Sequence, residues 1–257
     1  MNAYQRFVYL FPHDGRVEAA MFQIGVCYMF SGQFDRAVQS FSHLMNTFEM
    51  DAFTVQAYFR VSDIYVELGK AASAITTLQN LAKIATDFQV RDECYYRIGW
   101  IYLERTEWEQ ARVSFDKISP ENAVAYRLRD LVDGLQTHVS GKKKHPGLAG
   151  MLSIIPGGGQ VYCERYQDAL IAFLLNGGLI YAAYEAFDRE LYALAGVIAF
   201  VEVGFYSGNI YGAVSGAHKY NRRKDRKFIE QLRENVKISL SARPATRGVE
   251  LALGFSF

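Results

Sequence analysis

The first half of the chain carries apolar residues with the period of a helix, in blocks that repeat every 37 residues. Within a block they fall at i, i+3, i+4 and i+7, as between Ala20 and Tyr28, and this spacing is typical of an amphipathic helix. A second helix follows a short turn, from Phe34 to Phe48 in the first block. Since one such pair cannot bury its apolar faces alone, the pattern predicts helix pairs that stack into a solenoid.

Three blocks align without a gap, and the residues they share have a structural meaning. Small residues in both helices let the paired helices approach closely, and a glycine after the first helix ends that helix and allows a tight turn. The aligned positions are Gly25, Ser62 and Gly99; Tyr28, Tyr65 and Tyr102; Gly32, Gly69 and Thr106; Ala37, Ala74 and Ala111; and Phe41, Leu78 and Phe115.

These positions resemble the tetratricopeptide repeat family over about residues 1–120. The small-x-x-Tyr of the first helix, the glycine at the turn and the Ala-x3-Phe of the second helix carry the resemblance, which implies a fold that binds partners rather than a reaction. Residues 2–11 align with a second helix, so we expect an earlier repeat whose first helix lies upstream of Met1. The expected segments are repeats at about 18–54, 55–91 and 92–120, a capping helix at 121–137 and a linker at 138–146, with the solenoid domain at 1–137.

The first helix of each pair lines the concave groove in this family, so the resemblance implies which residues face a partner. These positions are aromatic with a few acids, and Lys, Arg and Asn are not expected among them. A protein or peptide partner with apolar anchors fits them best, and the alternative is that the aromatics pack between repeats. The predicted groove residues are Phe22, Val26, Met29, Phe59, Asp63, Tyr96, Trp100 and Glu104.

Two long apolar runs follow the solenoid, with spans expected at about 168–187 and 191–216. Residues 169–187 hold one charged residue, Glu185 near the end, and residues 191–216 hold one, Glu202. Each run reaches the length of about 20 residues that crosses a bilayer core. With the polar turn at 188–190 they predict a transmembrane helical hairpin whose ends lie on the same side of the membrane. The alternative is a buried helix pair inside a soluble domain.

The second run carries a stripe of glycine at every fourth residue, which lets another backbone approach closely in lipid. The approaching helix is expected to be the first run, through residues 176–178, or the same run in a second copy of the chain. Asn176 and Glu202 are polar residues at membrane depth, and we expect them to bond to each other or to a neighbouring helix. The stripe consists of Gly204, Gly208, Gly212 and Gly216.

A glycine-rich motif precedes the hairpin, and it lacks the lysine and hydroxyl residue of a phosphate-binding loop. Its Pro-Gly-x-Gly-Gln-x-Tyr pattern resembles the start of small two-helix membrane domains of bacteria, over about residues 146–222, and this implies a bacterial envelope protein with a membrane domain at 147–222. Proline and glycine break a helix, so a bent or re-entrant start is expected. The motif residues are Pro156, Gly157, Gly159, Gln160 and Tyr162.

Charge divides the chain into two parts: residues 1–140 hold 13 Lys and Arg against 17 Asp and Glu, and the remainder holds 15 against 10. Basic residues at 142–144 and 219–227 flank the hairpin, so the positive-inside rule places both flanks and the solenoid on the cytoplasmic side of the bacterial inner membrane. A signal peptide upstream would place the solenoid in the periplasm. The basic run is also suited to contact anionic lipid head groups. It has no interleaved aromatic residues, so a nucleic-acid partner is not expected.

Residues 223–257 predict a basic helix and then a short β-hairpin, because apolar residues alternate at 236–240 and again at 249–257 on either side of a turn. The predicted fold class is therefore all-α, a tetratricopeptide-type solenoid followed by a transmembrane hairpin, with a β-hairpin tail.

These patterns together favour a membrane-anchored interaction scaffold. The alternative is a membrane accessory of envelope assembly or export in which the hairpin is the active part, and deletion of residues 1–137 would separate the two. Enzymatic activity is not expected, because the histidines have no placed nucleophile or carboxylate partner. No metal or cofactor is expected either, since the three cysteines lie far apart without ligand spacing.

Overall fold

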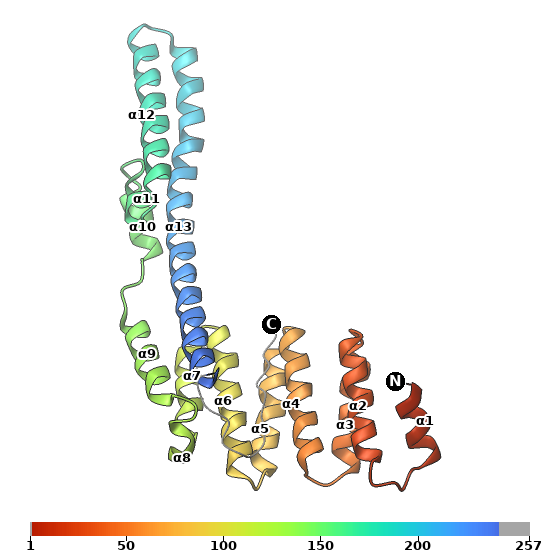
Figure 1. The fold of residues 1–257 in the computed structure, drawn as a ribbon. Helices are drawn as coiled ribbons and strands as arrows, with labels where there is room; N and C mark the ends of the chain where they lie inside the picture. The colour runs from red at the N-terminus through yellow and green to blue at the C-terminus, as the bar shows by residue number, and fades with distance from the viewer. Residues whose placement is uncertain (1, 242–257) are drawn as a thin grey trace. The chain divides into compact units, whose positions relative to one another are not determined.

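Helix pairs follow one another along the first part of the chain (Figure 1). The computed structural model describes the backbone of residues 2–241 and the side chains of residues 3–235. It divides into a solenoid unit, Met1–Val139 with the residues from Glu234 on, and a hairpin unit, Ser140–Arg233. The solenoid helices are α1 (Asn2–Leu10), α2 (Val17–Phe30), α3 (Phe34–Thr47), α4 (Ala52–Glu67), α5 (Ala71–Ile84), α6 (Phe88–Glu104), α7 (Trp108–Phe115), α8 (Pro120–Ala123) and α9 (Leu128–Ser140).

The predicted spacing appears directly in the second helices, because α3, α5 and α7 begin at Phe34, Ala71 and Trp108, 37 residues apart. Each turn before them passes through the left-handed region, with φ of 71° at Gly32, 70° at Gly69 and 58° at Thr106. Glycine enters this region without steric cost, whereas the β-branched threonine does not. The third turn therefore keeps the geometry of the first two with a strained residue.

Replacing Thr106 with glycine is expected to stabilise the solenoid by about 1 kcal/mol, because it removes the steric cost of the left-handed conformation. Trp100 and Trp108 are the only tryptophans of the chain and both lie in the solenoid, so their fluorescence reports its unfolding in urea within the full chain. The reverse change, Gly69→Thr, is the matched control and should lower the free energy of unfolding. An unchanged or lowered stability in Thr106→Gly would show that the turn carries no strain.

Close approach of paired helices is visible in the core. Phe41 and Phe115 are fully buried, and each ring lies against a glycine of the preceding helix. A Cβ atom on Gly25 would lie 2.6 Å from Cε1 of Phe41, and one on Gly99 would lie 2.3 Å from Cε1 of Phe115. The predicted need for small residues is confirmed at these two positions.

The end of the solenoid differs from the prediction in two ways. The expected single capping helix at 121–137 is divided into α8 and α9, because Arg127 between them adopts a φ of 51°. The expected linker at 138–146 is shorter, since α9 continues to Ser140 and α10 begins at Pro146. His138 is buried, with its ring centroid 5.0 Å from that of Trp108, so it belongs to the solenoid core.

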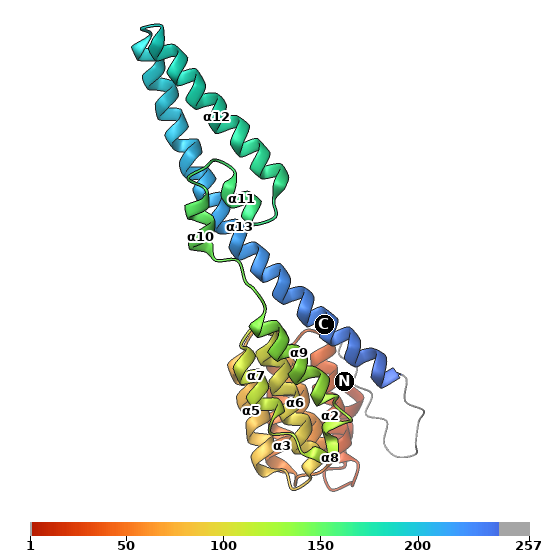
Figure 2. The same cartoon turned by 90° about the vertical axis from the view of Figure 1, so that its left-hand side faces the viewer.

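Two long helices dominate the hairpin unit (Figure 2). Both are long and apolar enough to cross a membrane, and their most apolar windows are only 11% and 17% buried. Large apolar side chains point outward from them, as Phe200 does with an exposed fraction of 82%. The helices of this unit are α10 (Pro146–Leu152), α11 (Gly158–Tyr162), α12 (Tyr166–Asp188) and α13 (Tyr192–Ser241).

The first strand of the predicted β-hairpin, at residues 236–240, is not formed. Residues 236–240 lie within α13, so helix formation continues through the alternating pattern, and residues 2–241 contain no strand. The second predicted strand, 249–257, lies outside the described residues.

Candidate functional site

Arg97 of α6 connects the first helices of two neighbouring repeats. Its Nε donates to Glu93 at 2.6 Å, and its Nη1 donates to Asp63 of α4 at 3.0 Å. The guanidinium also lies 4.4 Å from the ring centroid of Phe59. Because the Arg97 side chain is only 15% exposed, these attractions act in a poorly solvated setting and are stronger than at an open surface. The contacts hold Phe59 and Asp63 in fixed positions on one face of α4 and α6.

We call this surface the α4–α6 face, made of Phe59, Asp63, Arg97, Trp100 and Glu104. Arg97 is not among the predicted groove residues, and it joins two of them, Phe59 and Asp63. Arg60, one period earlier, also pairs with Asp63, with the Arg60 Nη1 atom 3.9 Å from the carboxylate. Arg97 could have been found from the sequence, because it stands one helical turn from both Glu93 and Trp100.

Two predicted groove residues are core residues instead. Phe22 is 5% exposed, and its ring lies between those of Phe41 and Phe53, at centroid distances of 5.5 and 5.7 Å. Tyr96 is 3% exposed and stacks on Tyr126 at 4.5 Å, and burial raises the pKa of Tyr96 to about 12. Neither side chain is available to a partner.

The remaining predicted groove residues differ in exposure. Val26 and Met29 are half-buried and pack against the core of the first repeat. Trp100 is half-buried and its ring makes a T-shaped contact with that of Tyr96, and Glu104 is exposed. Phe30, one turn after Val26, is 82% exposed. The apolar surface that a partner can reach on the first helices therefore centres on Phe30, Phe59 and Trp100.

A polar network attaches α8 to the start of α6. The Asp92 carboxylate is buried and accepts hydrogen bonds from the Ser119 backbone N–H at 3.1 Å, from the Ser119 hydroxyl, and from Asn122 Nδ2 at 2.8 Å. Tyr126 donates its hydroxyl to Glu93 at 3.0 Å. These bonds satisfy buried acids that would otherwise be costly, and they close one end of the α4–α6 face.

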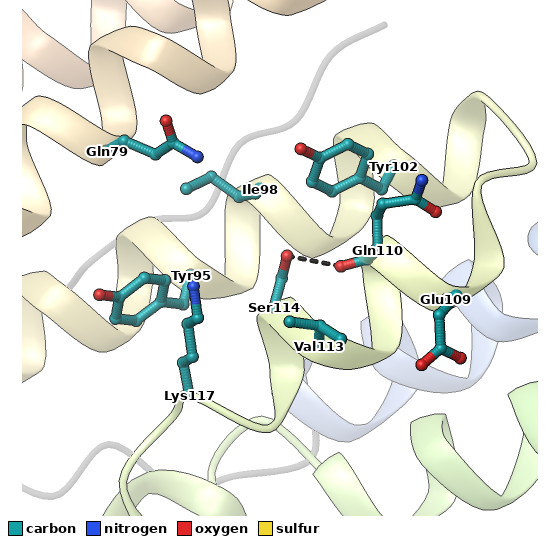
Figure 3. A pocket seen from close by; sticks show the side chains of 9 residues that line it. All are labelled: Gln79, Tyr95, Ile98, Tyr102, Glu109, Gln110, Val113, Ser114 and Lys117. Atoms are coloured by element: carbon teal, nitrogen blue, oxygen red, sulfur yellow. Dashed lines mark hydrogen bonds between the residues drawn. The ribbon is translucent and has the colours of Figure 1, made fainter.

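The opposite side of α6 has a shallow depression of about 290 Å³ (Figure 3). Tyr95, Ile98 and Tyr102 come from α6, on the side turned away from Arg97 and Trp100. The Lys117 ammonium lies 5.4 Å from the Tyr95 ring centroid. This depression was not predicted, because the repeat pattern identifies Tyr102 only as an aligned position. The lining residues are Gln79, Tyr95, Ile98, Tyr102, Glu109, Gln110, Val113, Ser114 and Lys117.

A pair of acids lies where α2 and α4 begin. Asp51 caps α4, since its Oδ1 accepts hydrogen bonds from the backbone N–H groups of Phe53 and Thr54, both at 2.9 Å. Burial, followed by the neighbouring Asp51 carboxyl, raises the pKa of Glu18 from 4.5 to about 7. Glu18 therefore binds its proton more tightly in the folded chain than in the unfolded chain.

This shift predicts a pH dependence of stability. Because the folded-state pKa is the higher one, the stabilisation is fully present below the unfolded pKa and is lost as the pH rises toward about 7. Glu18→Gln should remove the contribution of Glu18 to the change of the free energy of unfolding with pH. The variant should therefore be more stable than the original chain at about pH 8. Urea unfolding followed by tryptophan fluorescence at about pH 5 and about pH 8 measures both effects, with the exposed Glu67→Gln as control. Parallel slopes for Glu18→Gln and the original chain would contradict the shift.

The helix pairs of the solenoid are similar to those of known proteins. Models described as tetratricopeptide repeat match residues 19–48, 55–88 and 93–119. The matched segments have the tetratricopeptide repeat fold. The solved structures include a tetratricopeptide repeat protein from Parabacteroides merdae ATCC 43184, which is 17% identical, with 90% of each chain covered and a TM-score of 0.43. No curated protein matches the chain.

The glycine-rich motif forms a compact turn at the base of the hairpin. Gly157 has a φ of 85°, and a Cβ atom there would lie 2.4 Å from the carbonyl oxygen of Ala169. A Cβ atom on Gly159 would lie 2.2 Å from the carbonyl oxygen of Ala149 and 2.6 Å from Cβ of Ala213. A side chain therefore fits at neither position, and the motif brings α10, α11, α12 and α13 together.

Asn209 of α13 joins this turn to α13 through hydrogen bonds of its side-chain amide. Its Oδ1 accepts hydrogen bonds from Gln160 Nε2 at 2.8 Å and from the Gly157 N–H at 3.3 Å, and its Nδ2 donates to the Ser153 carbonyl at 3.0 Å. Asn209 and Gln160 are both buried. Pro156 is half-buried, and the Tyr162 hydroxyl accepts from the His145 N–H at 3.0 Å. Asn209 was not predicted, because no alignment of blocks or motif includes it.

Asn176 and Glu202 are both buried between the two long helices, with exposed fractions of 1% and 8%. Asn176 donates to the Ala172 carbonyl at 2.6 Å. Its Oδ1 and both carboxyl oxygens of Glu202 have no hydrogen-bond partner among the described residues, so the expected bond between the two side chains is not formed.

The glycine stripe is only partly covered. Cβ atoms on Gly204 and Gly208 would meet no atom within 4 Å, and the same holds for Gly177 and Gly178, so the expected packing of the stripe on the first helix is not formed. A Cβ atom on Gly216 would instead lie 3.2 Å from Arg165 Nη1.

Proposed function

We propose that the chain is a non-enzymatic, membrane-anchored scaffold in which the solenoid binds a protein or peptide partner and the hairpin holds it at a bilayer. The supporting observation is the pairing of two features in one chain. Tetratricopeptide repeats present a preorganised α4–α6 face, and two long helices expose apolar side chains along most of their length.

The hairpin has the dimensions that a bilayer requires. From Tyr192 to Gly212 the helix rises about 31 Å at 1.5 Å per residue, which is about the thickness of the hydrocarbon core. The charged side chain of Arg165 lies at the C-terminal end of this stretch, since its Nη1 donates to the Gly212 carbonyl at 3.2 Å. The polar turn at Arg189 marks the other end.

The segment around α10 and α11 fits the membrane interface. Its buried side, with Ala149, packs against Ala213 and Ala217, whereas its outer side exposes large apolar residues. Such a face is suited to the boundary between head groups and acyl chains. The exposed residues are Leu148, Met151, Leu152, Ile154, Ile155 and Val161.

The charge around the hairpin supports one orientation in the membrane. Basic residues flank both ends of the hairpin, so in this proposal the flanks and the solenoid face the cytoplasm at the inner membrane of a bacterium. Self-association through Gly204 and Gly208 stays a prediction.

Site-specific photo-crosslinking in the native membrane tests the partner face. A photoreactive residue in place of Trp100 should give a discrete protein adduct, and Phe30→Ala in the same chain should reduce its yield about tenfold, the effect of losing one apolar anchor. The same photoreactive residue in place of Val113, exposed on the opposite side of the repeat, is the matched control.

Equal adducts from positions 100 and 113, or none from position 100, would contradict the proposed face. Deletion of residues 1–137 separates the alternative function, because a chain that keeps its cellular role without the solenoid would favour the hairpin as the active part.

A further inference from the structure

Five cationic side chains lie along one side of α13, C-terminal to its apolar stretch from Tyr192 to Gly212. They are Lys219, Arg222, Arg223, Arg226 and Lys227. Their spacing of i, i+3, i+4, i+7 and i+8 places them on a single helical face about two turns long. We call them the cationic stripe. All five side chains are exposed.

The stripe differs from the other lysines of this region in having no acidic partner. Lys144 pairs with Glu164 at 3.1 Å, and Lys143 pairs with Asp225 at 3.6 Å. Lys224, on the inner side of α13, donates to the Lys142 carbonyl at 3.0 Å. Within the described residues, none of the five stripe cations forms an ion pair. Like charges one turn apart destabilise a helix, so a stripe of this kind needs anions from another molecule.

The position of the stripe indicates where those anions come from. The opposite side of α13 is occupied, because Asn221 bonds to the backbone N–H and carbonyl of Lys144 at 2.9 and 2.8 Å. The helix just before the stripe packs through Ala213 and Ala217 against α10 and α11, whose outer side is apolar. The apolar surface therefore ends at about Ala217, and the stripe begins two residues later.

We infer that the cationic stripe is a binding site for the phosphate head groups of anionic phospholipids. The inference rests on the proposed membrane location of the hairpin. Cations at the edge of an apolar surface lie at the depth of lipid phosphates, and this arrangement favours anionic over zwitterionic lipid. A nucleic acid fits less well, because no aromatic side chain stands among the five cations for a base to stack on.

The experiment uses the full chain reconstituted in phosphatidylcholine bilayers that contain a small amount of spin-labelled phosphatidylglycerol or spin-labelled phosphatidylcholine. The fraction of each label that the protein immobilises gives the lipid selectivity. We expect phosphatidylglycerol to be preferred about fivefold or more at low salt, the contribution of a single cation near an anionic surface, and less at high salt.

Two variants with the same loss of charge identify the source of the selectivity. Arg222→Gln, Arg223→Gln, Arg226→Gln and Lys227→Gln together should bring the preference close to one. The matched control changes four exposed cations of the solenoid, Arg6, Lys70, Lys83 and Arg91, to glutamine and should keep it.

The outcomes are distinguishable. Insertion into phosphatidylcholine without preference for the anionic label overturns the inference and leaves the membrane proposal intact. Equal loss of preference in both variants also overturns it, since net charge would then be the cause. The inference is also contradicted if the chain shows no preference for the anionic lipid but binds nucleic acid through the cationic stripe. Failure to insert contradicts both proposals.

Discussion

Replacing Gly99 with serine is expected to destabilise the solenoid by about 3 kcal/mol. The Cβ atom would lie 2.3 Å from Cε1 of Phe115, whose ring is fully buried, so either the ring or the helix must move. Densely packed cores resist such movement. Urea unfolding of the full chain in mild detergent, followed by tryptophan fluorescence, measures the loss.

The second repeat supplies the control for this change. There the equivalent residues are Ser62 and Leu78, both buried, so serine is accommodated opposite the smaller leucine. Phe115→Leu should therefore recover about 2 kcal/mol in the Gly99→Ser background beyond the sum of the separate effects. Additive single and double variants would show that the ring and residue 99 do not compete for the same space.

Replacing Asn209 with alanine is expected to open the base of the hairpin. The change removes the partner of the buried Ser153 carbonyl and Gly157 N–H, whereas Gln160 Nε2 keeps its second bond, to the backbone carbonyl of residue 209 at 3.0 Å. Each of these two unsatisfied groups costs about 1–3 kcal/mol, so local opening should become at least about 30-fold more frequent. Cys163 reports this opening, because it is 3% exposed and its thiol lies 3.5 Å from the Ala213 carbonyl.

The measurement is the rate at which a thiol reagent modifies Cys163, with the labelled site read by mass spectrometry. Ser207→Ala, on an exposed part of the same helix, is the control and should leave the rate unchanged. Labelling of Cys94 in the solenoid should also stay constant. If Cys163 is modified at the same rate in Asn209→Ala and in the original chain, Asn209 does not hold the base of the hairpin closed.

The repeat period predicted the solenoid well because its signal is redundant. The same small residues, turn residues and buried aromatics recur every 37 residues, so Gly25, Gly99 and the turn at Gly69 follow from the pattern. The period does not determine rotation within each helix to better than one residue. For that reason Phe22 and Tyr96 were assigned to the groove although their rings lie in the core.

The contacts between particular residues of different helices could not be predicted, because the period places a residue on a helix face without naming its partner. Arg97 meets Asp63 across two helices, and Asn209 meets Gly157 after more than fifty intervening residues. The division of the cap at Arg127 depends on one left-handed residue that is not a glycine. The strand predicted at 236–240 failed because a period of two over five residues is a weak signal beside a long helix that is already formed.

Flotation of the full chain with lipid vesicles on a density gradient tests directly whether the hairpin resides in a bilayer. Flotation separates membrane insertion from aggregation, since aggregates sediment while vesicles rise. If the hairpin spans the bilayer, the chain floats with the vesicles, stays with them through an alkaline wash and is released only by detergent. A folded, monomeric chain that stays with the buffer fractions in the absence of detergent would contradict this location.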